Sequence, residues 1–154
     1  ETKYWNEYIC KRFENTGKHI SPELAEEICR LVDNHSSYVQ QLSWLLWIRT
    51  INTATTEQLS YALEDLLDQN NILFQSETEN LSAYQMNFLK AIVDGIHTKF
   101  SSKEVISKYN LGTSANIVRL KNALLQKELI ETNGKEIVLA DPVFEVWFKK
   151  EMLY

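Results

Sequence analysis

The sequence predicts a mainly α-helical protein with a single small β-hairpin near its C-terminal end. Leu, Ile, Val and aromatic residues recur at three- and four-residue spacing along most of the chain, as they do in amphipathic helices. Only 4 Gly and 2 Pro occur in 154 residues, so few positions interrupt these helices. The hydrophobic content of 44% is enough for one ordinary core or for two small ones.

Charge divides the chain into two halves. Residues 1–80 contain 6 Lys and Arg against 13 Asp and Glu, a net charge of -7, whereas residues 81–154 contain 10 against 8, a net charge of +2. Residues 75–80 lie between the halves and include no apolar side chain. We therefore place a boundary there between a domain 1–80 and a domain 81–154, and we expect the two domains to face different partners.

The first half reads as four helices. The opening helix ends at Gly17, a natural position for the left-handed residue that follows a helix. Ser21 and Pro22 provide an N-cap and a first-turn proline for the second helix, and the third runs from about residue 37 to residue 50. The fourth starts at Thr55-x-x-Gln58, whose side chains can satisfy free backbone N–H groups reciprocally.

The longest apolar run, residues 44–48, is far short of the roughly 20 residues that a membrane-spanning helix needs. We interpret it as a core segment of the third helix. Cys10 and Cys29 are expected to be buried thiols, since no framework of paired cysteines is present. No secretion signal opens the chain, so the expected compartment is the cytoplasm. The chain begins with Glu1 rather than Met and enters a helical pattern at once, which suggests a piece of a larger protein.

The second half begins with three helices. Ser82-x-x-Gln85 caps the first and Ser101-x-x-Glu104 caps a short second one. Residues 110–112 then form a tight turn with a glycine, and Thr113 or Ser114 caps the third helix. This third helix turns Ile117, Leu120 and Leu124 inward. A short helix, a glycine turn and a longer helix make a helix-turn-helix.

A strand over residues 129–132, a turn at Asn133-Gly134 and a strand over residues 136–139 form a hairpin, because Asn-Gly is the strongest short hairpin signal. Asp141-Pro142 then caps a closing helix. The hairpin is the wing of a winged helix-turn-helix domain.

The third helix of this domain is the candidate binding element. Its outward positions are Asn116, Arg119, Asn122, Ala123 and Gln126. The Asn, Arg and Gln side chains among them can read base edges or hold phosphates. Further phosphate contacts are expected from Lys103, Lys108, Lys121 and Lys135. A net charge of +2 is nevertheless small for a tight DNA binder, and winged helices also bind proteins, so both partners stay open at this stage.

Neither catalysis nor metal binding is predicted for this chain. His19, His35 and His97 are far apart and have no Cys or carboxylate at metal-ligand spacing, which favours ordinary surface histidines. The acidic residues of the first half fall on helix faces opposite the leucines, which favours solvated faces. No G-x-x-x-x-G-K-[ST] phosphate loop occurs, so this chain cannot hydrolyse ATP by itself.

Three segments together resemble a known family. They are residues 34–42 (NHSSYVQQL), residues 111–117 (LGTSANI) and residues 141–148 (DPVFEVWF), and the resemblance covers essentially the whole chain. The sequence is similar to the C-terminal region of archaeal-type ATPases of the AAA+/STAND superclass. In that family a P-loop nucleotide-binding domain precedes a helical lid and a winged helix. The resemblance implies ATP and Mg²⁺ as cofactors of a parent protein, and it places His35 at the start of a lid helix that faces the nucleotide domain.

The leading functional hypothesis is a regulatory lid and winged helix of an ATPase, in which the upstream nucleotide-binding domain controls a winged helix that engages DNA or a protein. The alternative is a free-standing winged-helix transcription regulator whose helical half is a dimerisation domain. A small hydrolase with a cryptic site ranks third.

Overall fold

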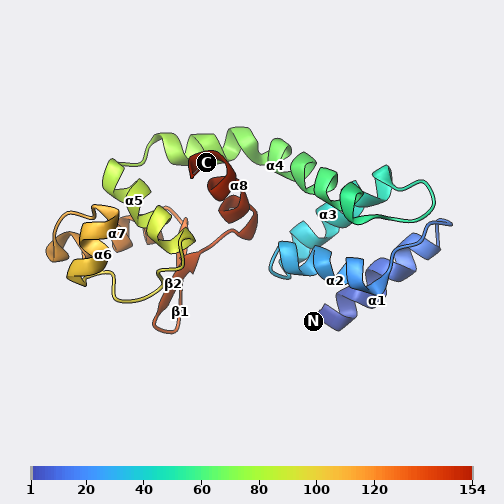
Figure 1. Ribbon diagram of the computed structural model, residues 1–154, viewed down its shortest axis with the longest axis horizontal. Coiled ribbons are helices and arrows are strands. Elements are labelled where there is room, and N and C mark those ends of the chain that lie inside the picture. Colours follow the sequence, from blue (N-terminus) through green and yellow to red (C-terminus); the bar gives the residue numbers. More distant parts are fainter. Residues whose placement is uncertain (1, 154) are drawn as a thin grey trace. The chain divides into compact units, whose positions relative to one another are not determined.

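The computed structural model describes residues 2–153. It divides into two compact units between Asn71 and Ile72. The first unit contains α1 (Thr2–Glu14), α2 (Pro22–Leu31), α3 (Ser36–Arg49) and the larger part of α4 (Thr56–Glu79) (Figure 1). The core of this unit includes Ile9 and Phe13 of α1 and fully buried side chains of α2, α3 and α4, among them Ile28, Leu42, Leu46 and Leu66.

The predicted helix starts of the first unit are confirmed where a local hydrogen bond defines them. The Ser21 hydroxyl accepts from the Leu24 N–H at 3.2 Å, and Pro22 follows as the first residue of α2. The Thr55 hydroxyl accepts from the Gln58 N–H at 3.2 Å, while the Gln58 amide oxygen accepts from the Thr55 N–H at 3.1 Å. Such caps satisfy backbone donors that the first helical turn leaves without partners.

Helix α4 differs from the expectation at its C-terminal end. It continues through residues 75–79, where the polar sequence predicted a linker. Phe74 and Thr78 are buried, and the Thr78 hydroxyl donates to the carbonyls of Phe74 and Gln75. The segment is helical because one side of it packs into the second unit, although its other positions are polar.

The second unit contains the end of α4, α5 (Ala83–Val93), α6 (Lys103–Tyr109), α7 (Ser114–Gln126), β1 (Ile130–Asn133), β2 (Glu136–Leu139) and α8 (Pro142–Met152). β1 and β2 pair antiparallel, with Ile130 opposite Leu139 and Asn133 opposite Glu136. The predicted fold class, mainly α with a helix-turn-helix and a hairpin wing, is confirmed.

Aromatic side chains form the core of the second unit where α8 meets the end of α4. The Phe74 ring lies 5.3 Å from the Phe144 ring and 5.6 Å from the Trp147 ring, measured between centroids. The Asp141 carboxylate fixes the start of α8 by accepting from the N–H groups of Val143 and Phe144, as the sequence predicts. Core contacts of this kind account for most of the stability of a small domain.

One helix N-cap and one hairpin turn lie one residue away from their predicted positions. Ser102, not Ser101, is the N-cap of α6 and accepts from the Val105 N–H at 3.2 Å. The hairpin turn consists of Gly134 and Lys135, since Asn133 is still paired with Glu136. Gly134 has a φ of +64° at the first central position, where a type II′ turn requires glycine.

The apolar run 44–48 is only partly a core segment. Leu45 and Leu46 are buried, but Trp44 and Ile48 are about half exposed. Cys29 is buried as predicted, and burial raises the pKa of its thiol, whereas Cys10 is only half-buried. No described helix is both long and apolar enough to cross a membrane.

Candidate partner-binding surface of the winged helix

Helix α7 is positioned by a turn that several side chains hold in place. Asn110 ends α6 in the left-handed region with a φ of 53°, and Gly112 follows with a φ of +86°. The Asn87 side-chain amide donates to the Asn110 carbonyl at 3.2 Å, and the Asn116 amide donates to the Leu111 carbonyl at 3.2 Å. These bonds tie the turn to α5 and to α7, so the direction of α7 is fixed within its unit.

One side of α7 packs into the unit and the other faces solvent. Ile117, Leu120 and Leu124 are buried, as predicted. Arg119, Asn122 and Gln126 are exposed. Asn116 is half-buried, and its side-chain amide donates to the Leu111 carbonyl in the turn. Asn116 therefore stabilises the turn before α7.

A hollow of about 290 Å³ lies at the N-terminal end of α7. The described residues that line it are the charged Arg119 and the uncharged Tyr84, Gly112, Thr113, Ala115 and Asn116. The Tyr84 ring reaches it from α5, and a Cβ on Gly112 would come within 3.5 Å of that ring. The hollow therefore combines an aromatic wall, polar groups and one cation.

The predicted lysines do not form one continuous basic row with Arg119. Lys121 is half-buried and lies two positions after Arg119, or about 200° around the helix axis. Lys103 and Lys108 are exposed on α6 but are five positions apart, which is about 140° around that helix. Lys135 is exposed in the hairpin turn, between the exposed carboxylates Glu131 and Glu136 in sequence. The basic side chains are thus separated and interleaved with acidic ones.

The outward positions predicted for α7 did not include Val118, and Ala123, which was predicted to face outward, is half-buried. The Val118 side chain is 63% exposed, beside Arg119 in sequence and one turn before Asn122. Helical periodicity predicts this exposure, because Val118 and Asn122 are four residues apart and therefore share a face. Tyr84, another partly exposed residue of the surface, is 43% exposed on α5 and has no signal in the local sequence.

His35 and His97 have different surroundings. His35 is the exposed N-cap residue of α3, makes no side-chain capping bond and lies against the Tyr38 ring, 4.9 Å away between centroids. His97 was expected to be ordinary surface but is half-buried: its Nδ1 lies 3.0 Å from the Ile137 carbonyl, while its own carbonyl accepts from the Ile137 N–H at 2.9 Å. His97 therefore anchors the wing. Within residues 2–153, no group of three or more His, Cys, Asp and Glu is arranged for metal binding.

Comparison with known proteins agrees with this architecture. Residues 72–150 match the family of probable winged helix domains, and the chain belongs to that family. The match starts at the first residue of the second unit. No curated protein matches the chain.

Among solved structures, the chain is similar to the Walker-type ATPase PABY2304 of Pyrococcus abyssi, with a TM-score of 0.71 and 19% sequence identity. The similarity covers 94% of this chain but 41% of that protein, so both units are matched and the chain spans less than half of the ATPase. The resemblance to archaeal ATPases that the sequence suggests is therefore confirmed at the level of the fold.

Proposed function

We propose that this chain is the lid and effector part of a Walker-type ATPase. The observation that supports this proposal most is that one structural match covers 94% of this chain, and so both of its units, within a longer ATPase structure. In this proposal the first unit packs against an upstream nucleotide-binding domain, with His35 at the start of α3 near that contact. ATP and Mg²⁺ then belong to the parent protein, and this chain transmits the nucleotide state without catalysing the reaction.

The winged helix unit is the effector, and its partner in this proposal is a protein. The exposed face of α7 combines the apolar Val118 with Arg119 and Asn122, and a hollow with an aromatic wall lies at its end. Protein interfaces favour such mixtures of aromatic, apolar and Arg side chains. The carboxylates Glu131 and Glu136 near the wing lysine oppose the phosphate attraction on which DNA binding depends.

Duplex DNA is the second candidate partner. It is favoured by the exposure of Arg119, Asn122 and Gln126 on one helix that leads into a wing. Arg can pair with a guanine edge, and Asn and Gln can pair with adenine. In this case a winged helix regulator would still be controlled by the nucleotide domain.

A photo-crosslinking amino acid at position 118 distinguishes the two partners. We expect adducts with a discrete protein in cells, and we expect Arg119→Ala to reduce them, because both positions lie on the proposed contact face. The same amino acid at position 127, which is exposed just beyond the end of α7, is the matched control. Equal labelling from positions 118 and 127 would contradict a specific contact through α7.

A salt series of fluorescence anisotropy with duplex DNA provides the other arm of this experiment. We expect no binding by the unsubstituted chain at about 50 mM salt, where phosphate attraction is strong. Binding there would decide for DNA. Arg119→Ala should then reduce the free energy of DNA binding by about 1 to 3 kcal/mol if the side chain reaches a guanine edge. Lys135→Ala should lower the slope of the logarithm of the binding constant against the logarithm of the salt concentration by about one unit.

A further inference from the structure

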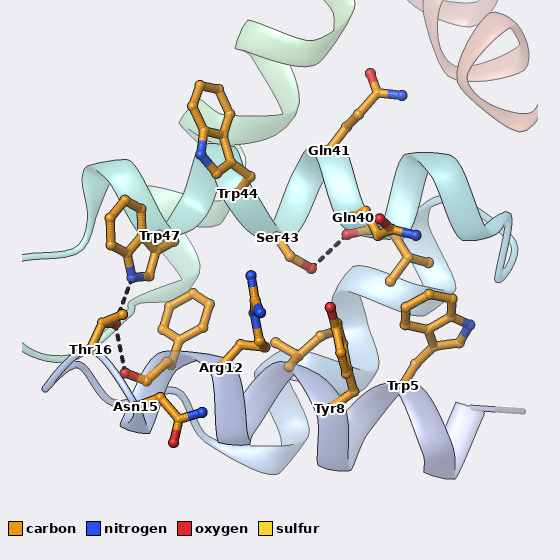
Figure 2. A pocket seen from close by; sticks show the side chains of 13 residues that line it. Trp5, Tyr8, Arg12, Asn15, Thr16, Gln40, Gln41, Ser43, Trp44 and Trp47 are labelled. Carbon is orange, nitrogen blue, oxygen red and sulfur yellow. Dashed lines mark hydrogen bonds between the residues drawn. The ribbon is translucent and has the colours of Figure 1, made fainter.

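A second candidate binding site lies within the first unit, in a groove between α1 and α3. The groove has a volume of about 710 Å³. Its floor consists of the buried side chains Ile9, Phe13 and Val39. Its sides are mainly aromatic, with Trp5 and Tyr8 from α1 and Trp47 from α3, while Trp44 of α3 lies at its edge with its ring pointing away from α1 (Figure 2).

One end of the groove is held firmly by polar contacts. The Trp47 indole N–H donates to the Thr16 hydroxyl at 2.8 Å, and that hydroxyl donates to the Phe13 carbonyl at 2.9 Å. The Lys18 ammonium lies 3.9 Å from the centre of the Trp47 ring and donates to the Trp47 carbonyl at 2.7 Å. The end of α1 is therefore joined to the end of α3, and the walls of the groove are preorganised there.

Large aromatic side chains remain open to solvent along the groove. The Trp44 side chain is 58% exposed, and Tyr8 is 38% exposed. Tyr4, one turn before Tyr8, is 66% exposed and stacks on it at 6.3 Å between ring centroids. Tyr4, Trp5 and Tyr8 are in mutual ring contact on α1, and a cluster of partly exposed aromatic residues usually marks an interaction surface.

Among the described residues that line the groove, Arg12 is the charged one. Its side chain extends from α1 into the space between the helices, with Tyr8 on one side and Trp47 on the other (Figure 2). Its guanidinium lies 5.8 Å from the centre of the Tyr8 ring, and it forms no ion pair with any residue in the part of the chain that the structure describes. A planar cation bordered by apolar side chains is suited to a bidentate carboxylate.

The charge of the two helices also favours an acidic occupant. The first half of the chain is acidic, but α1 carries three basic residues against two acidic ones, and α3 carries Arg49 and no acidic residue. Most of the carboxylates are on α2 and α4. Arg12 lines the groove and Lys18 lies on the Trp47 ring at its end, so the charges on the described residues nearest to an occupant are positive.

We propose that the α1–α3 groove binds an amphipathic helix of a separate protein, with apolar side chains on the aromatic walls and a carboxylate paired with Arg12. Two helices with apolar residues at one-turn spacing present the kind of surface into which a third helix packs. This site is independent of α7, so its failure would leave the proposed role of the winged helix untouched.

The experiment selects peptides from a displayed library of random helical sequences on the 154-residue chain. We expect the selected peptides to share two or more large apolar residues at helical spacing and an Asp or Glu beside them. For a labelled peptide from this selection, Trp44→Ala should weaken binding about tenfold or more, because tryptophan side chains contribute strongly to the binding energy of interfaces. Tyr61→Ala is the matched control, because Tyr61 is a half-exposed aromatic residue outside the groove.

Charge reversal tests the role of Arg12 directly. The Arg12→Glu variant should no longer bind the acidic peptide, but it should bind a peptide in which Lys replaces the carboxylate residue. Lys11→Glu, an exposed change outside the groove, should keep binding to the acidic peptide and gain none to the Lys peptide. The proposal is overturned if the library yields no binder, or if binding survives both Trp44→Ala and Arg12→Glu. If the chain self-associates and Trp44→Ala abolishes that self-association, the groove binds a second copy of the chain, and the proposal is overturned as well.

Discussion

Phe74→Ala is expected to lower the free energy of unfolding of the second unit by about 3 to 5 kcal/mol. The Phe74 side chain is 1% exposed and contacts Phe144 and Trp147, so its removal leaves a cavity between α4 and α8. Urea denaturation followed by fluorescence measures this loss. Trp147 is the only tryptophan of the second unit, so replacing Trp5, Trp44 and Trp47 with Phe makes the signal specific.

Leu73→Ala is the matched control for this change. Leu73 precedes Phe74 on the same helix but is 56% exposed, so its replacement should change the free energy of unfolding by no more than about 0.5 kcal/mol. A loss below about 1 kcal/mol for Phe74→Ala would mean that the end of α4 is not part of the winged helix core.

Leu46→Ala is expected to destabilise the first unit by about 2 to 5 kcal/mol, because Leu46 is fully buried on α3. Hydrogen exchange followed by mass spectrometry locates the effect. Amides of α1, α2 and α3 should lose protection while those of α5, α7 and α8 keep theirs, since the two units have separate cores.

Ile48→Ala provides the comparison for Leu46→Ala, because Ile48 is on the same helix and is 50% exposed. It should leave the exchange pattern unchanged. If Leu46→Ala instead lowered protection equally in both units, the chain would unfold as one cooperative body, and the division into two units would not describe its energetics.

Features set by hydrogen bonds between near neighbours in the sequence could be predicted from the sequence. The caps at Ser21, Thr55, Ser82 and Asp141 involve partners two or three residues away, so the residue types alone indicate them. The inward face of α7 was also predictable, because helical periodicity places Ile117, Leu120 and Leu124 together.

Features that depend on distant contacts were missed. Residues 75–79 are polar, and only the packing of Phe74 against α8 explains why the helix continues there. The spacing Ser101-x-x-Glu104 favoured the first of two adjacent serines, although Ser102 is the residue that caps α6. The α1–α3 groove needs residues from two helices that are separated by a third, and no pattern within either helix shows that their aromatic faces meet.

The exposed face of α7 could be predicted only in part from the sequence. Its polar residues were identified correctly, because periodicity places Arg119, Asn122 and Gln126 outward. The connection of Asn116 to the turn and the half-burial of Lys121 depend on tertiary structure. These two residues are therefore less exposed than the sequence suggests.

Calorimetric titration with Mg-ATP of the full-length gene product, beside the 154-residue chain, tests most directly whether this chain is the effector part of an ATPase. The proposal predicts saturable binding by the full-length protein and none by the chain, which lacks a G-x-x-x-x-G-K-[ST] loop to hold the phosphates. Saturable binding by the chain itself, or no binding by the full-length protein, would contradict it.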